Sequence, residues 1–108
     1  MEKIKIDTTL ECFLNEIELL KDKIVSIYLF GSRAGNNFRP DSDYDLLIVV
    51  KKKERRFIDG LYEAVMNTLL RDGRLMSLKI FEEKQFEYLA SIPTPFMEKV
   101  IKGGIKIG

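Results

Sequence analysis

The chain has 108 residues, 45% of them hydrophobic, and this length and composition predict a single domain over residues 1–108. With 18 Lys and Arg against 17 Asp and Glu, the net charge is +1, which gives no support for strong general nucleic-acid binding. The absence of histidine excludes Ser-His-Asp, Cys-His and imidazole acid–base catalysis within this chain.

A helix and then a strand are predicted at the start of the chain. Thr8 and Glu11 have the spacing of a capping box, so we expect a helix from Thr8 to about Asp22. Its apolar face should pack on a sheet and contains Leu10, Phe13, Leu14, Ile17 and Leu20. The apolar and β-branched run from Ile24 to Phe30 then predicts a buried strand that stops at a tight turn at Gly31.

A second strand and a second helix follow. The strand is predicted from Asp43 to Val50, and the charged segment Lys51 to Arg56 comes after it. Apolar residues then recur at helical spacing despite Gly60 and predict a helix to about Arg71, where Asp72-Gly73 ends it. These apolar positions are Phe57, Ile58, Leu61, Tyr62, Val65, Leu69 and Leu70.

A third strand is predicted from Leu75 to Phe81, and its side chains alternate between two faces. The face expected in the core contains Met76, Leu78 and Ile80. The opposite face contains Leu75, Ser77 and Lys79.

The last part of the chain predicts two short helices and a closing strand. The first helix is expected around Glu83 to Ala90. Thr94 and Pro95 have the residue types of an N-cap and a first-turn proline, and they predict a helix that ends near Gly103-Gly104. Ile105 to Ile107 is expected to form a short extra strand.

Neither secretion nor membrane insertion is expected. The single Cys12 cannot form an internal disulfide, and the first residues are charged rather than signal-like. No apolar run has the length of a membrane span, so we expect a soluble cytoplasmic protein with no membrane partner.

The turn at Gly31-Ser32 and the carboxylates of Asp43 and Asp45 form the most informative pattern. Gly31 lets another group approach the backbone, and the Ser32 hydroxyl and nearby N–H groups can bind phosphate oxygens. Side chains alternate along a strand, so Asp43 and Asp45 share a face with about 6.5–7 Å between their Cα atoms. Each part alone has a structural reading, as a common turn or as a solvated strand entrance.

The position of the two carboxylates favours a metal site. They open a strand whose remainder, Leu46 to Val50, is apolar, and two negative charges at the mouth of a buried strand repel each other. Bound Mg²⁺ would relieve this repulsion, and Mg²⁺ typically takes one or two protein carboxylates together with phosphates and water. Arg33 and Arg39 flank this site and either reach phosphates or lie in a solvated loop.

These residues resemble the signature of the minimal nucleotidyltransferases, small members of the superfamily that shares its catalytic core with DNA polymerase beta. That signature is Gly-Ser, a ten-residue interval from this serine to the next, and then Ser-Asp-x-Asp-Leu. Ser32 and Ser42 have this interval, and Asp43, Asp45 and Leu46 complete the pattern. The resemblance covers nearly the whole chain and implies an α/β (α+β) fold, with a small mixed sheet and helices packed mainly on one face.

The resemblance also implies roles for these residues. Asp43 and Asp45 would be catalytic and would ligate Mg²⁺. Gly31 and Ser32, with Arg33 and Ser42 beside them, would hold a nucleoside triphosphate, expected to be ATP. The reaction would transfer a nucleoside monophosphate and release pyrophosphate.

The chain departs from the family pattern in two places. Gly35 stands one position early, which leaves Asn36 in the usual glycine position. Catalytically complete relatives also carry a third carboxylate on the strand after the second helix, and Ser77 is expected at that position here. Lys79 would pair with a nucleotide phosphate, neutralise Asp43 or simply lie on the surface. The nearby acidic residues that could replace the carboxylate lie at the ends of the strand and are Asp72, Glu82 and Glu83.

Two functions from different classes remain. Minimal nucleotidyltransferases of this size often accompany a small helical HEPN-type partner in toxin–antitoxin pairs. The resemblance therefore implies an enzyme that transfers AMP from ATP to a hydroxyl on such a partner, as its antitoxin. The alternative is a degenerate, non-catalytic module that binds a nucleotide or a partner, because Ser77 stands where the third carboxylate is expected.

Overall fold

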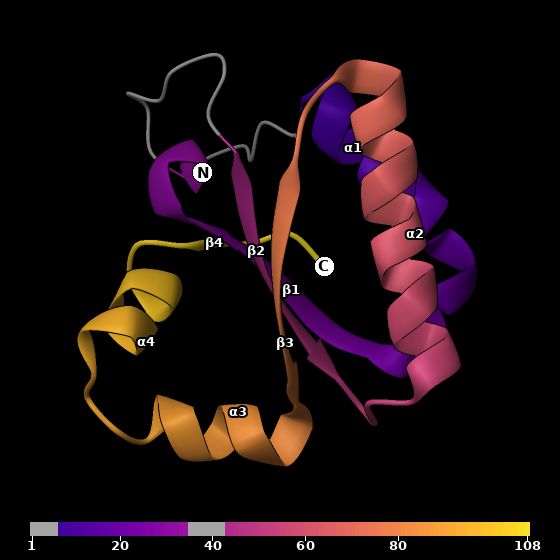
Figure 1. The fold of residues 1–108 in the computed structure, drawn as a ribbon. Coiled ribbons are helices and arrows are strands. Elements are labelled where there is room, and N and C mark those ends of the chain that lie inside the picture. Colours follow the sequence, from indigo (N-terminus) through magenta and orange to yellow (C-terminus); the bar gives the residue numbers. More distant parts are fainter. Residues whose placement is uncertain (1–6, 35–42) are drawn as a thin grey trace.

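The computed structural model describes residues 7–34 and 43–108, and within these ranges four strands form one mixed sheet with the order β3-β2-β1-β4 (Figure 1). The strands are β1 (Ile24–Phe30), β2 (Tyr44–Val50), β3 (Met76–Glu82) and β4 (Ile105–Lys106). β1 is antiparallel to both β2 and β4, whereas β2 and β3 are parallel. The predicted mixed sheet is therefore confirmed.

Helices cover both faces of this sheet unequally. The longer helices α1 (Thr8–Glu16) and α2 (Arg55–Asp72) lie together on one face, and the shorter α3 (Glu83–Ala90) and α4 (Pro95–Ile101) lie on the other (Figure 1). Two 3-10 segments, η1 (Glu18–Lys23) and η2 (Gly31–Ala34), flank β1. The α/β fold class is confirmed, with most of the helical packing on the α1 and α2 face.

β2 is buried on both of its faces, which explains its almost unbroken apolar sequence. Leu46, Ile48 and Val50 pack in the core beneath α1 and α2 and are fully buried. Leu47 and Val49 point to the other face, where they pack in a second cluster with α4. A strand held from both sides gives the residues at its start a rigid support.

The start of α1 differs from the predicted capping box. The N-cap is Asp7, whose Oδ1 accepts a hydrogen bond of 2.8 Å from the Leu10 backbone N–H. Thr8 is instead the first helical residue, so the predicted N-cap was wrong by one position. The reason is local, because the residue before Thr8 is itself a strong N-cap type and adopts the extended backbone that a cap requires.

The predicted first helix is also shorter than expected, because the α-helix ends at Glu16 and the 3-10 segment η1 continues to Lys23. Leu20 of η1 packs against α2 at Gly60, where the site of an added Cβ would lie 3.0 Å from Leu20 Cδ1. The glycine inside α2 therefore makes room for η1.

The remaining predicted elements agree with the structure to within about two residues. β1 and α3 have the predicted bounds, and α2 ends with Gly73 in the left-handed conformation at a φ of 69°. Thr94 caps α4, since its Oγ1 accepts a 3.2 Å hydrogen bond from the Met97 backbone N–H. None of the helices in the described part of the chain is long and apolar enough to cross a membrane.

Candidate functional site

The turn after β1 is built closely against β2. Gly31 has a φ of 75°, a left-handed conformation that side chains disfavour, and it opens the 3-10 segment η2. A Cβ at this position would overlap the carboxylate oxygen Oδ2 of Asp45. The glycine therefore serves two needs at once, a backbone conformation and a close approach between the turn and a carboxylate.

Asp43 and Asp45 lie on either side of Tyr44, as the strand pattern predicted. Tyr44 points into the core with 3% exposure, so the two carboxylates belong to the opposite side of the strand. Asp43 is exposed and Asp45 is partly buried. The structure thus brings Asp45 to the Gly31 turn and leaves Asp43 open to solvent beside it.

The surroundings of Asp45 disfavour its ionised form. Burial raises the pKa of the Asp45 carboxyl, and the negative charge of Asp43 raises this pKa further. The positive charges of Lys99 and Lys79 act on the pKa in the opposite direction. A divalent cation between the two aspartates would remove this repulsion, so the electrostatics suits a cation site.

Ser77 occupies the strand position at which the third carboxylate was expected. In the parallel ladder of β2 and β3, the partner of Asp45 is Ser77, and Lys79 follows on the same face. No cluster of three or more Asp, Glu, Cys or His side chains suited to a metal occurs in the described ranges. Among the described residues, therefore, the Asp pair supplies the carboxylates, and Mg²⁺ typically combines one or two protein carboxylates with phosphate and water oxygens.

Two of the alternative acidic residues lie at the far end of the sheet. Glu82 pairs with Val50, five residues along β2 from Asp45, a separation of about 16 Å at the usual strand rise. Its carboxylate accepts a 2.8 Å hydrogen bond from the Lys53 backbone N–H. Glu83 follows it as the first residue of α3, so neither residue approaches the Asp pair.

Arg33 lies in a cluster that holds the turn in place. Its guanidinium stacks on the Tyr44 ring at 4.2 Å from the ring centroid and pairs with Asp7 Oδ2 at 3.6 Å, and its side chain is only 6% exposed. The Tyr44 hydroxyl donates a hydrogen bond to the same carboxylate. These contacts tie η2 and β2 to the start of α1, while direct contact of Arg33 with a nucleotide stays a prediction.

Sequence reasoning did not assign Asp7 or Tyr44 to this region. Burial raises the pKa of Tyr44, and the hydrogen bond and negative charge of Asp7 raise it further, so the phenol stays protonated. The available signals were local: Asp7 precedes a helical pattern, and Tyr44 is the residue between the two aspartates. Neither signal shows that the two side chains meet.

Some predicted positions cannot be placed. Ser42, Arg39, Gly35 and Asn36 lie outside the described residues. Ser32 is described as part of η2, but its side chain is not.

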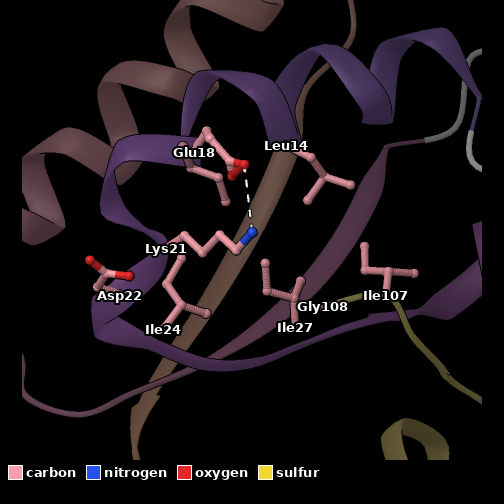
Figure 2. Close-up of a pocket in the computed structure, with 9 residues that line it drawn as sticks. Leu14, Glu18, Lys21, Asp22, Ile24, Ile27, Ile107 and Gly108 are labelled. Carbon is pink, nitrogen blue, oxygen red and sulfur yellow. Dashed lines mark ion pairs between the residues drawn. The ribbon is translucent and has the colours of Figure 1, made fainter.

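A separate apolar pocket lies on the other side of β1. It has a volume of about 480 Å³ and is lined by residues of α1, η1, β1 and the C-terminal segment, and Figure 2 shows the Lys21–Glu18 ion pair at its edge. The two ionic groups of this pair are 3.6 Å apart. None of the predicted site residues lines this pocket, so it is distinct from the Asp pair.

The fold and the Gly-Ser and Asp-x-Asp elements together define a nucleotidyltransferase domain. The model of the family described as "Polymerase beta, Nucleotidyltransferase" matches residues 14–108, and the chain belongs to this family.

The individual similar proteins either match a short segment of the chain or share the fold at low sequence identity. A segment of 35 residues is 49% identical to spectinomycin 9-adenylyltransferase of Campylobacter jejuni, and it spans 32% of this chain and 14% of that enzyme. Two solved structures of the toxin–antitoxin complex MntA–HpeT also share the fold. One, a variant with two aspartates changed to glutamate, has a TM-score of 0.52 and 18% identity over 87% of this chain and 70% of that chain. The other, a tyrosine-to-alanine variant, has a TM-score of 0.57 and 15% identity over 96% of this chain and 73% of that chain.

Proposed function

We propose that this chain is a Mg²⁺-dependent nucleotidyltransferase that transfers AMP from ATP to a hydroxyl on a small helical partner protein of the HEPN type, as its antitoxin. The observation that carries this proposal is the packing of the Asp45 carboxylate against the Gly31 backbone, with Asp43 beside it. A triphosphate bound at the turn would lie next to both carboxylates.

The residues of the site fit a hard cation. Asp43 and Asp45 supply carboxylate oxygens, and the raised pKa of Asp45 reflects burial and a neighbouring negative charge that a cation would offset. When bound, Mg²⁺ supplies charge stabilisation for the attacking and leaving oxygens of an in-line displacement. The chain itself would position the nucleotide, through the turn at Gly31 and the carboxylates that would hold the cation.

The proposed reaction breaks a phosphoanhydride bond of ATP and forms a phosphoester bond to the acceptor. The acceptor hydroxyl oxygen bonds to the α-phosphorus of ATP, and the bond from that phosphorus to the oxygen bridging to the β-phosphate breaks. The products are the adenylylated acceptor and pyrophosphate, and the hydroxyl proton is released. Because the chain has no histidine and Ser77 stands beside Asp45, no side chain among these residues is an evident general base.

The proposal of a protein partner is supported by the similar proteins. The curated enzyme with the matching segment is an adenylyltransferase, and the two solved structures described above are of a toxin–antitoxin complex. An adenylyl donor site together with a protein partner supports the transfer of AMP to that partner.

A second function, binding without turnover, is favoured by one observation. Ser77 is the in-register neighbour of Asp45, so the described site contains two carboxylates rather than three. A site of this kind can still bind a Mg²⁺–nucleotide complex while the transfer step is slow or absent, because general-base catalysis typically contributes about 10²- to 10⁴-fold in rate.

Label transfer separates the two functions. The chain is incubated with Mg²⁺, the helical protein encoded beside its gene, and ATP labelled at either the α- or the γ-phosphate. We expect the α-label to appear on the partner and the γ-label not to appear. Asp43→Asn should abolish labelling, whereas Asp59→Asn, which changes an exposed aspartate of α2, should not.

The opposite result would point to the binding module. In that case no nucleotide gives labelling, and a stable complex with the partner forms equally well with the wild type and with Asp43→Asn.

A further inference from the structure

The sheet face that contains Asp45 is bordered by two strands and one helix. Phe30 of β1 and Ser77 of β3 are the in-register neighbours of Asp45. Phe96 of α4 packs edge-on against Phe30, with ring centroids 5.6 Å apart. Val100 of the same helix is fully buried in the cluster that also contains Phe30 and Leu47. The helix α4 is therefore anchored over the strands beside Asp45.

This anchoring places Lys99 on the helix that packs on the sheet face of Asp45. Lys99 is exposed and lies between Phe96 and Val100, the α4 residues that pack on the sheet. Burial and the charge of Asp43 raise the pKa of Asp45. The positive charge of Lys99 lowers this pKa, and its effect is larger than that of Lys79. A residue distant in sequence thus places a positive charge near the carboxylate.

Lys79 lies on β3, on the same face of the sheet as Asp45. It follows Ser77 by two residues on the same strand face, with about 6.5–7 Å between their Cα atoms. Its side chain is exposed, and its charge also lowers the pKa of Asp45, after that of Lys99. The positive charges of the two lysines therefore act on Asp45 from two different elements, β3 and α4.

Neither ammonium group is committed to another partner within residues 7–34 and 43–108. The ion pairs among these residues are Lys21–Glu18, Lys23–Glu54 and Arg33–Asp7. Lys79 and Lys99 donate none of the side-chain hydrogen bonds found there. Their donors are thus available to a ligand at the Asp pair.

We propose that Lys79 and Lys99 form a polyphosphate-binding pair that holds the β- and γ-phosphates of the nucleoside triphosphate beside Asp45. This inference rests on the proposed function for the identity of the nucleotide. A triphosphate brings more negative charge than one divalent cation cancels, and lysine ammonium groups bind phosphate oxygens through charge-assisted hydrogen bonds. The same pair would hold the pyrophosphate as it leaves.

The proposed lysine pair also suggests a role for the β3 residues at the position where a third carboxylate is expected. Ser77 is the uncharged neighbour of Asp45 in the ladder, where an acidic residue would add a further negative charge beside Asp45. With Ser77 and Lys79 at this edge, the site has cations opposite its carboxylates. Such an arrangement favours holding a triphosphate.

The test compares ligands with and without the outer phosphates. Lys79→Met and Lys99→Met keep an unbranched side chain and remove the charge, and Lys102→Met at the end of α4 is the matched control. Affinities for ATP, AMP and inorganic tripolyphosphate are measured by titration calorimetry with Mg²⁺ present. Urea unfolding of each variant verifies that it is folded.

We expect Lys79→Met and Lys99→Met each to weaken ATP and tripolyphosphate binding about tenfold or more, the size of one hydrogen bond to a charged group. AMP binding should stay within about twofold in these variants, and Lys102→Met should match the wild type for every ligand. If the wild type binds ATP and both variants bind it equally well, the lysine pair is refuted and the proposed function stands.

Tripolyphosphate distinguishes the remaining cases. Wild-type binding of tripolyphosphate that both variants lose supports the lysine pair even if ATP itself is not bound, a result that would refute only the nucleotide function. If the wild type binds neither ATP nor tripolyphosphate, both proposals are refuted.

Discussion

Gly31→Ala is the substitution that most sharply tests the contact between the turn and Asp45. Gly31 and Gly73 have similar positive φ angles, 75° and 69°, but their surroundings differ. A Cβ at Gly31 would overlap Asp45 Oδ2, whereas a Cβ at Gly73 would meet nothing within 4 Å. Gly73→Ala is therefore a control that has the same backbone cost without the contact.

The expected magnitudes follow from this difference. Each alanine in a left-handed conformation costs roughly 1–2 kcal/mol of stability. Only Gly31→Ala must also displace the Asp45 carboxylate, and a misplacement of about 1 Å in a catalytic site can cost about 10²-fold in rate. We expect Gly31→Ala to lower adenylyl transfer about 100-fold and Gly73→Ala to leave it within about twofold.

Two assays check this prediction on the same samples. Urea unfolding gives the free energy of unfolding, and transfer of α-labelled ATP to the partner gives the rate. We expect Gly31→Ala to lose at least as much stability as Gly73→Ala and to lose far more of the transfer rate. The reasoning is refuted if Gly31→Ala transfers label as fast as Gly73→Ala, because the close approach to Asp45 would then have no function.

Three further predictions concern stability. Burial, together with the hydrogen bond to Asp7, raises the pKa of Tyr44 above 10.0. The protonated phenol therefore contributes its full share to the free energy of unfolding below about pH 10, and this share is lost as the pH rises through the folded-state pKa. Urea midpoints measured from pH 8 to 11 should fall more steeply for the wild type than for Tyr44→Phe, and equal slopes would contradict this. Asp45→Asn should raise the urea midpoint in metal-free buffer, more than Asp43→Asn at its exposed position, because burial and Asp43 disfavour the Asp45 charge; a lower midpoint for Asp45→Asn would count against the electrostatic account. Thr94→Ala should cost about 1 kcal/mol in the same assay while Thr94→Ser costs less, and equal losses would show that the cap hydrogen bond is unimportant.

Local sequence pattern was sufficient for most of the fold. β1 stands out because its apolar run ends at a glycine, and α4 because threonine and proline mark its first turn. The start of α1 was missed because two cap candidates, Asp7 and Thr8, are adjacent and pattern alone does not choose between them. In the structure the N-cap is Asp7, and its carboxylate also contacts Tyr44 and Arg33.

The candidate site was only partly visible in the sequence. The alternation of side chains along the third strand correctly placed Ser77 on the sheet face of Asp45, and the two residues are in register in the structure. The stacking of Arg33 on Tyr44 was not foreseen, because both residues were considered only for their own motifs. Lys99 was missed altogether, because its proximity to Asp45 depends on how α4 packs on the sheet.

The most direct test of a metal–nucleotide site at the Asp pair is paramagnetic broadening of amide NMR signals. The ¹⁵N-labelled chain is titrated with ATP and Mn²⁺ in place of Mg²⁺. We predict broadening centred on Gly31 and Asp45, little effect at Asp59 on α2, and loss of the local broadening in Asp45→Asn. Broadening centred elsewhere, or unchanged in Asp45→Asn, would contradict the assignment of this site.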